Sequence, residues 1–294
     1  MIDSTNLNLT EATVNKIRFI ANMDTNYVFH MLSVSKCGYD NSYGQHYAPR
    51  YPAEDLAVLK TQEKLITVRG GEHCGALYGI FVCEAACAKL SAKDYYTKLI
   101  QKATNNDIPV ALSKYSEIIC QLAAVMIKHY DYYVENIWPV EQRKISQYIP
   151  TVQHLLEDIA FTEKAEAAVG NQLPHDFFTA TLVTSVENGA EAIDISDEQD
   201  VFGIERTAID AFYFIGHEYI IYLLFNALKD ENAFRELNTW NITEGLAEYY
   251  LKQTLGDTRF FNTHEKYVLF FEQTNFQKQL DGVALYRKAL EFFC

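Results

Sequence analysis

The chain has 294 residues, 49% of them hydrophobic and 22% charged, with a formal net charge of −14. This composition excludes a largely disordered chain and is typical of a globular protein with a sizeable hydrophobic core. A nucleic-acid-binding protein needs clustered Lys and Arg to displace counterions. The sequence has no basic stripe of that kind, so nucleic acid is excluded as an expected partner.

The first half of the chain is predicted to be helical. The segment from Thr10 to Asn22 begins with Thr10-Glu11-Ala12, a pattern that can cap a helix, and has apolar residues at helical spacing. A loop rich in Gly, Asn, Tyr and Pro is expected from Cys37 to Pro52. Helical spacing or helix-forming composition predicts the other helices of this half at residues 26–34, 53–68, 75–89, 92–103, 113–137 and 140–169.

Cysteine usage and the N-terminus bear on the cellular compartment. No two of the 6 cysteines form a C-x-x-C pair, but Cys83 and Cys87 are four residues apart and would be neighbours on one face of a helix. The N-terminus has neither the basic segment nor the apolar segment of a secretory signal. We therefore expect two packed thiols at Cys83 and Cys87, and a cytoplasmic protein with free cysteines.

The composition changes near residues 165–176, which predicts a helical N-terminal region over 1–170 and an α+β region over 171–294. Phe177 to Thr184 is rich in aromatic and β-branched residues, Asn188-Gly189 suits a turn, and Glu191 to Ile195 alternates, so a β-hairpin is predicted. Acidic residues 197–200 suit the start of a helix. A long apolar helix over about 204–228, a second helix over 241–255 and a helical tail over 260–293 are then expected.

The long apolar helix contains the sequence His217-Glu218-Tyr219-Ile220-Ile221. In the motif H-E-x-x-H, two histidines four apart on one helix face bind zinc, and the glutamate activates a water molecule. Here the position of the second histidine is Ile221, which has no lone pair to give a metal. The charged pair also interrupts the longest apolar run, Ala211 to Leu228, which therefore predicts a buried core helix rather than a membrane span.

Residues 177–255 resemble the gluzincin metallopeptidases. A small sheet precedes the helix with His217-Glu218, and the following helix has the sequence Thr243-Glu244-Gly245-Leu246-Ala247-Glu248-Tyr249. The resemblance implies a zincin-like unit in which His217 and Glu244 bind zinc and Glu218 is the general base. Ile221 leaves two ligands where a catalytic zinc has three and a water. Glu248 is a candidate for orienting a ligand, and His264 is a candidate replacement ligand.

Each of these residues also has an ordinary structural interpretation. His217 and Glu218 could be a buried hydrogen-bonded pair, because adjacent ionisable groups in an apolar helix need polar partners. Asn241 and Glu244 have the spacing of a capping box, in which Glu244 turns back to the start of its helix. Glu248 could face solvent, and His264 could lie at the surface or pack in the core.

The predicted fold is mainly α, of the α+β type, and three functions stay open. The first is a zinc-dependent metallopeptidase that hydrolyses peptides bound along the sheet edge, with zinc as its cofactor. The second is an inactive homologue, a pseudoenzyme that binds a peptide or a partner protein. The third is an unrelated helical interaction protein. The sequence leaves the oligomeric state open.

Overall fold

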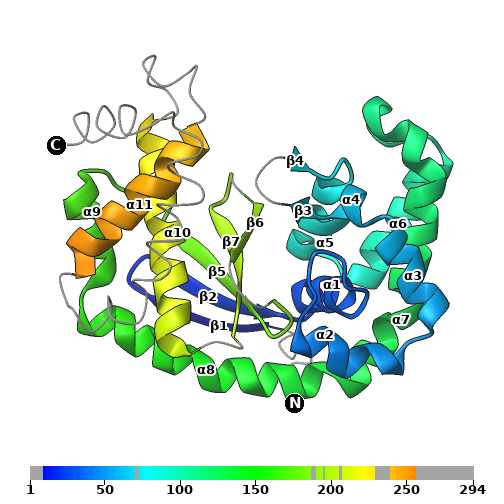
Figure 1. Ribbon diagram of the computed structural model, residues 1–294, viewed down its shortest axis with the longest axis horizontal. Helices are drawn as coiled ribbons and strands as arrows, with labels where there is room; N and C mark the ends of the chain where they lie inside the picture. The colour runs from blue at the N-terminus through cyan, green and yellow to red at the C-terminus, as the bar shows by residue number, and fades with distance from the viewer. Residues whose placement is uncertain are drawn as a thin grey trace. The chain divides into compact units, whose positions relative to one another are not determined.

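The computed structural model describes residues 9–69, 73–186, 190–194, 196–204, 207–228 and 239–255. Among these residues, helices predominate and are accompanied by a five-stranded sheet and a two-stranded sheet (Figure 1). This confirms the predicted fold class, mainly α of the α+β type. The more specific likeness to zincins stays a prediction.

The larger sheet has the strand order β1-β2-β5-β7-β6. The helix predicted over Thr10 to Asn22 is wrong, because this segment forms β1 (Leu9–Val14) and β2 (Ile17–Asn22). Buried and half-buried residues alternate along β2, which is the period of a strand. Asn15 adopts a φ of 51° in the connection between the two strands, a conformation that asparagine tolerates better than most residues.

Both strands of the predicted β-hairpin are present, but they do not pair with each other. The strands β5 (Phe178–Val183) and β6 (Ala190–Asp194) are separated in the sheet by β7 (Gln199–Gly203), and β6 pairs antiparallel with β7. All six residues of β5 are buried, and because successive side chains point to opposite faces, both faces of this strand are covered. Residues 197–200, predicted to begin a helix, lead into β7 instead, and the predicted Asn188-Gly189 turn lies outside the described residues.

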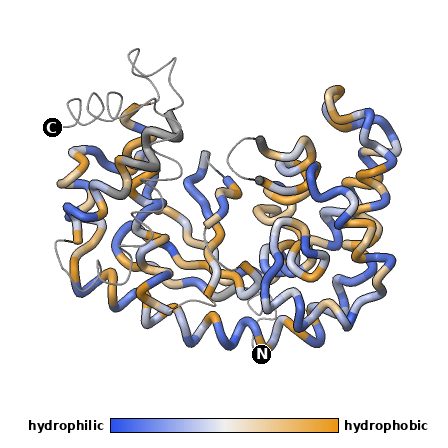
Figure 2. Tube along the Cα trace, viewed as in Figure 1, coloured by the Kyte–Doolittle hydropathy of each residue, from blue (hydrophilic) through white to orange (hydrophobic). Residues whose placement is uncertain are grey.

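The described residues form two compact units that interleave along the sequence. Among the described residues, the first unit takes in those within 9–11, 19–148 and 181–204, and the second takes in those within 12–18, 149–180 and 207–255. The predicted boundary near residue 170 stays a prediction. Figure 2 shows hydrophobic and hydrophilic residues interleaved along the helices of residues 92–104 and 116–136, as expected for helices with one buried face.

The first unit is organised around α1 (Met23–Val34), in which every described side chain except that of Asp24 is buried. Its polar residues are satisfied by backbone acceptors: Asn26 Nδ2 donates to the Leu182 carbonyl at 3.0 Å, and Ser33 Oγ donates to the Ser185 carbonyl at 2.6 Å. Buried polar groups need such partners, so these bonds fix the helix against the end of β5.

Further helices surround α1 in this unit, and α6 (Ala92–Thr104) and α7 (Ser116–Asn136) lie side by side (Figure 1). The predicted helices at 26–34, 92–103 and 113–137 are confirmed. The predicted loop from Cys37 to Pro52 is wrong for residues 42–50, because Asn41 caps a short helix by accepting a hydrogen bond from the Gly44 amide at 2.7 Å. The remaining elements are α2 (Ser42–Tyr47), η2 (Ala48–Arg50), α3 (Ala53–Thr61), α4 (Glu63–Ile66), β3 (Val68–Arg69), β4 (His73–Cys74), the π-helical η3 (Gly79–Cys83), α5 (Glu84–Cys87) and η4 (Val110–Tyr115).

The second unit is built from α9 (Phe161–Val169), α10 (Ala208–Leu228) and α11 (Thr239–Leu255), which pack against one another. The helix predicted over 140–169 is divided into α8 (Trp138–Asp158) and α9, with a left-handed residue, Ala160, between them. The two helices predicted in the last third are confirmed as α10 and α11. The predicted helical tail over 260–293 lies outside the described residues.

Two of the described helices, Val110–Asn136 and Ala208–Leu228, are long and apolar enough to cross a membrane. In Val110–Asn136, 28% of the apolar window is buried inside the protein, and in Ala208–Leu228 this share is 72%. A core helix of a soluble protein has the same length and composition, so neither helix tests the prediction that the chain lacks a membrane span.

Candidate functional site

The helix α10 begins at a capping box that sequence analysis missed. Thr207 Oγ1 donates to Asp210 Oδ2 at 2.7 Å and accepts from the Asp210 amide at 3.2 Å. This reciprocal pair satisfies polar groups at the helix start. It places the first residue of the helix at Ala208 rather than near residue 204.

The motif residues of α10 are largely buried. His217 is 1% exposed, and its ring stacks on that of Tyr213 one turn earlier, with 6.5 Å between the ring centroids. Glu218 is half-buried. Ile221 is 0% exposed, and burying an isoleucine side chain contributes about 1.5–3 kcal/mol to stability. The position that holds the second histidine in H-E-x-x-H is therefore part of the hydrophobic core.

Gly216 allows α10 to approach its neighbours closely beside His217. A Cβ atom at this position would lie 2.8 Å from Phe161 Cζ of α9 and 3.3 Å from Leu251 Cδ1 of α11. Such distances are shorter than ordinary contacts, so a larger residue here would require the Phe161 and Leu251 side chains to move. The helices α9 and α11 thus meet α10 where the motif begins.

Tyr219, inside the motif, has a structural role that sequence analysis also missed. Its hydroxyl donates to Glu166 Oε1 of α9 at 3.1 Å, and the same oxygen accepts from Lys16 Nζ at 2.6 Å. The Tyr219 ring is fully buried and meets the rings of Phe161 and Phe178. These contacts fix the rotation of α10 about its axis and keep Ile221 in the core.

The described side chains do not complete a catalytic zinc site. Among them, no group of three or more His, Cys, Asp and Glu residues is placed to hold a metal ion. The isoleucine at position 221 offers no donor, whereas a catalytic zinc takes three protein ligands. Glu244 and Glu248 lie on α11 as predicted, but their side chains are outside the described part of the chain, as is all of His264. The roles assigned to these three residues stay predictions.

A second polar cluster lies inside the first unit and was not found from the sequence. His30 Nδ1 lies 2.5 Å from the Tyr43 hydroxyl and His30 Nε2 lies 2.7 Å from the Tyr51 hydroxyl. Tyr43 donates to Glu141 Oε1, and Tyr133 donates to Glu141 Oε2 at 2.5 Å. Because the Tyr43 proton is directed at Glu141, its oxygen accepts from His30 Nδ1, and Nε2 accepts from Tyr51. We call these five residues the His30–Glu141 network.

The His30–Glu141 network predicts a pH dependence of stability. Burial, with the nearby charges of Arg50 and His129, lowers the pKa of His30 to about 3. An unfolded chain binds a proton at this histidine below about pH 6.5, and the folded protein does not. Stability therefore falls as the pH falls below that value. We expect a loss from this residue of about 1 kcal/mol between pH 6 and pH 5.

Urea unfolding of the wild type and of His30→Phe at both pH values checks this expectation. The variant should be less stable overall, but its loss between pH 6 and pH 5 should be about 1 kcal/mol smaller than in the wild type. His154→Gln is the matched control, because that side chain is 73% exposed, and it should follow the wild type. An equal loss in the wild type and His30→Phe would contradict the prediction.

Comparison of the chain with protein-family profiles, with curated protein sequences and with solved structures gives no match. The resemblance to gluzincins therefore rests on the residues between 177 and 255. Any function assigned to this site must therefore be argued from the side chains of α10 and from the packing of α11 against α10.

Proposed function

We propose that the chain is a zincin-like protein without peptidase activity, which binds a peptide or a partner protein and does not cleave it. The order of elements supports this relationship, because a sheet is followed by a helix with His217-Glu218 and then by a helix with Glu244. The observation that carries the proposal is the complete burial of Ile221. An isoleucine at this position has no donor atom for a metal.

The alternative is an active zinc metallopeptidase. One observation favours it: Glu218, the residue that the resemblance implies as general base, is only half-buried beside His217. A general base must reach the water whose proton it takes. Zinc would then need His217, Glu244 and a third donor, for which His264 is the candidate. The burial of His217 at 1% exposure argues against access of substrate to this centre.

Metal content separates the two functions. We expect protein dialysed against zinc without a chelator to keep much less than one zinc per chain by elemental analysis. Ile221→His should raise this value towards one, because it supplies the missing donor. Ile221→Val is the control for repacking and should not gain zinc, and circular dichroism checks that each variant is folded.

Activity and binding give the second readout. Anisotropy with a labelled mixed-sequence decapeptide pool should show binding that EDTA does not change, because no metal takes part. Glu218→Gln should bind as the wild type does, and neither protein should hydrolyse the pool. About one zinc per wild-type chain, with hydrolysis that Glu218→Gln abolishes, would replace the proposal by the active metallopeptidase. Absence of any binding would refute the binding function.

A further inference from the structure

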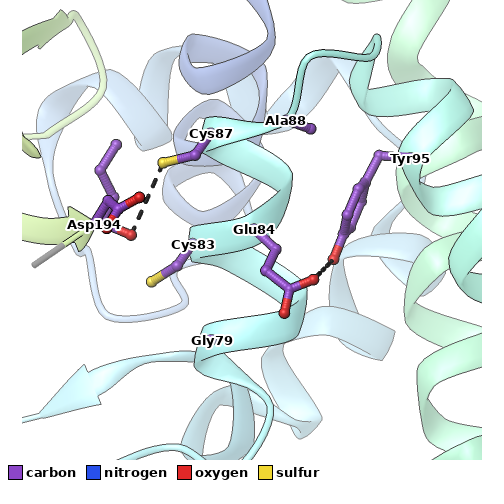
Figure 3. Close-up of a pocket in the computed structure, with 8 residues that line it drawn as sticks. Gly79, Cys83, Glu84, Cys87, Ala88, Tyr95 and Asp194 are labelled. Atoms are coloured by element: carbon purple, nitrogen blue, oxygen red, sulfur yellow. Dashed lines mark hydrogen bonds between the residues drawn. The ribbon is translucent and has the colours of Figure 1, made fainter. Parts of the chain in front are cut away.

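An open pocket of about 480 Å³ lies in the first unit, independently of α10. It is formed by η3 and α5 on one side and by the end of β6 on the other, and its lining includes Cys83, Cys87, Tyr95 and Asp194. Its volume falls in the range of small-molecule sites. Figure 3 shows both thiols on the side of the helix that faces Asp194, whereas Glu84 and Tyr95 are turned to the other side.

The two cysteines are neighbours but are not placed for a disulfide. Residues four apart on a helix have Cβ atoms about 5–6 Å apart, whereas a disulfide requires about 3.5–4.5 Å. Both cysteines are free. Cys87 Sγ lies 3.9 Å from the Ile193 carbonyl, which directs that thiol to the end of β6. The pocket therefore presents two separate thiols from neighbouring positions of one helical segment.

The charges around the thiols favour a neutral ligand. Burial raises the pKa of both Cys83 and Cys87 to about 12, and the Asp194 and Asp197 carboxylates add to the effect at Cys87. The thiols are thus protonated at neutral pH. A soft monovalent cation would need two thiolates and would leave a net negative complex beside Asp194. A neutral compound that condenses with two thiols, releasing water, adds no charge to the pocket.

We propose that Cys83 and Cys87 together form a site for trivalent arsenic compounds. Arsenous acid, As(OH)₃, is neutral and reacts with two thiols: two As–O bonds break, two As–S bonds form, and the two thiol protons leave with the hydroxyls as two water molecules. Arsenic stays trivalent, so no oxidant or reductant is needed. The remaining hydroxyl or an organic substituent on arsenic occupies the open pocket. Two sulfur donors suffice for this chemistry.

Phenylarsine oxide is the probe, because its arsenic accepts two thiols and no third. Intact-mass measurement of the full chain should show one adduct, formed with loss of one water, that a monothiol does not remove and a small dithiol does. Cys83→Ser and Cys87→Ser should each abolish the monothiol-resistant adduct. Cys74→Ser is the matched control, since Cys74 is exposed on β4 nearby, and it should retain the adduct.

Two results would overturn the proposal. One is a wild-type chain without a monothiol-resistant adduct, and the other is an adduct that persists in the Cys83→Ser, Cys87→Ser double variant. Cys83→Ala and Cys87→Ala, with thermal melting of all variants, show whether loss of the adduct reflects loss of the thiol or of the fold. Arsenous acid itself should compete with phenylarsine oxide for the wild-type chain, and failure to compete would restrict the site to organic arsenicals.

Discussion

Replacing Glu141 by leucine is expected to lower the free energy of unfolding by about 3–5 kcal/mol. The carboxylate is 1% exposed and accepts hydrogen bonds from the Tyr43 and Tyr133 hydroxyls. Leucine removes the acceptor that both buried donors share, and each donor buried without its acceptor costs about 1–3 kcal/mol. Glu141→Gln keeps one acceptor oxygen and should lose less. Chemical denaturation of the three proteins measures the difference.

The control for this substitution is Glu135→Leu, at an exposed position of α7. A surface change of this kind should alter stability by no more than about 0.5 kcal/mol. A similar loss in Glu135→Leu and Glu141→Leu would mean that the loss of any glutamate in this region destabilises the protein. The network would then have no special contribution.

The pH dependence of the same variants tests the ionisation of Glu141. Burial raises the pKa of this carboxyl, while the Tyr133 and Tyr43 hydroxyls oppose the shift. The folded protein therefore holds the proton to a higher pH than the unfolded chain does. That contribution to stability is complete below the unfolded pKa and is lost as the pH rises through the folded pKa. The advantage of the wild type over Glu141→Gln should accordingly shrink between pH 5 and pH 8.

The fold class could be predicted from the sequence because long segments, such as those of α6 and α7, have helical spacing that tertiary contacts do not overrule. The strands β1 and β2 could not be predicted from the sequence. Val14, Ile17 and Ile20 are at helical spacing, but Ile17, Phe19 and Ala21 also alternate, and pairing with β5 decides between the two periods. Partners that are distant in sequence settle such cases.

The candidate sites also divide into those that a local sequence pattern predicts and one that only tertiary packing forms. His217 and Glu218 could be placed on one helix because the motif is local, and Cys83 and Cys87 could be recognised as neighbours from their spacing. The His30–Glu141 network could not be found, because its members come from separate helices and loops and each is isolated in the sequence. Its existence depends on how α1, α7 and the segment around Tyr43 pack together, which no local pattern reports.

Gly44→Ala is expected to destabilise the protein by about 3 kcal/mol, because α1 and α2 meet at this glycine. A Cβ atom on Gly44 would lie 2.3 Å from the Ser33 carbonyl oxygen and 3.0 Å from its carbon. These are backbone atoms of α1, so no side-chain rotation relieves the clash. Ser33 Oγ also donates a hydrogen bond to the Ser185 carbonyl, so a shift of α1 away from α2 would disturb that bond.

Gly79→Ala is the matched control, because no atom lies within 4 Å of a Cβ placed on Gly79. Both changes remove a glycine and add one methyl group, so both restrict the unfolded chain in the same way. That restriction alone should stabilise Gly79→Ala by about 0.4–1 kcal/mol. Thermal or urea unfolding of the two variants should therefore give effects of opposite sign. Effects of the same sign and size would show that α1 and α2 are not in contact at Gly44 in solution.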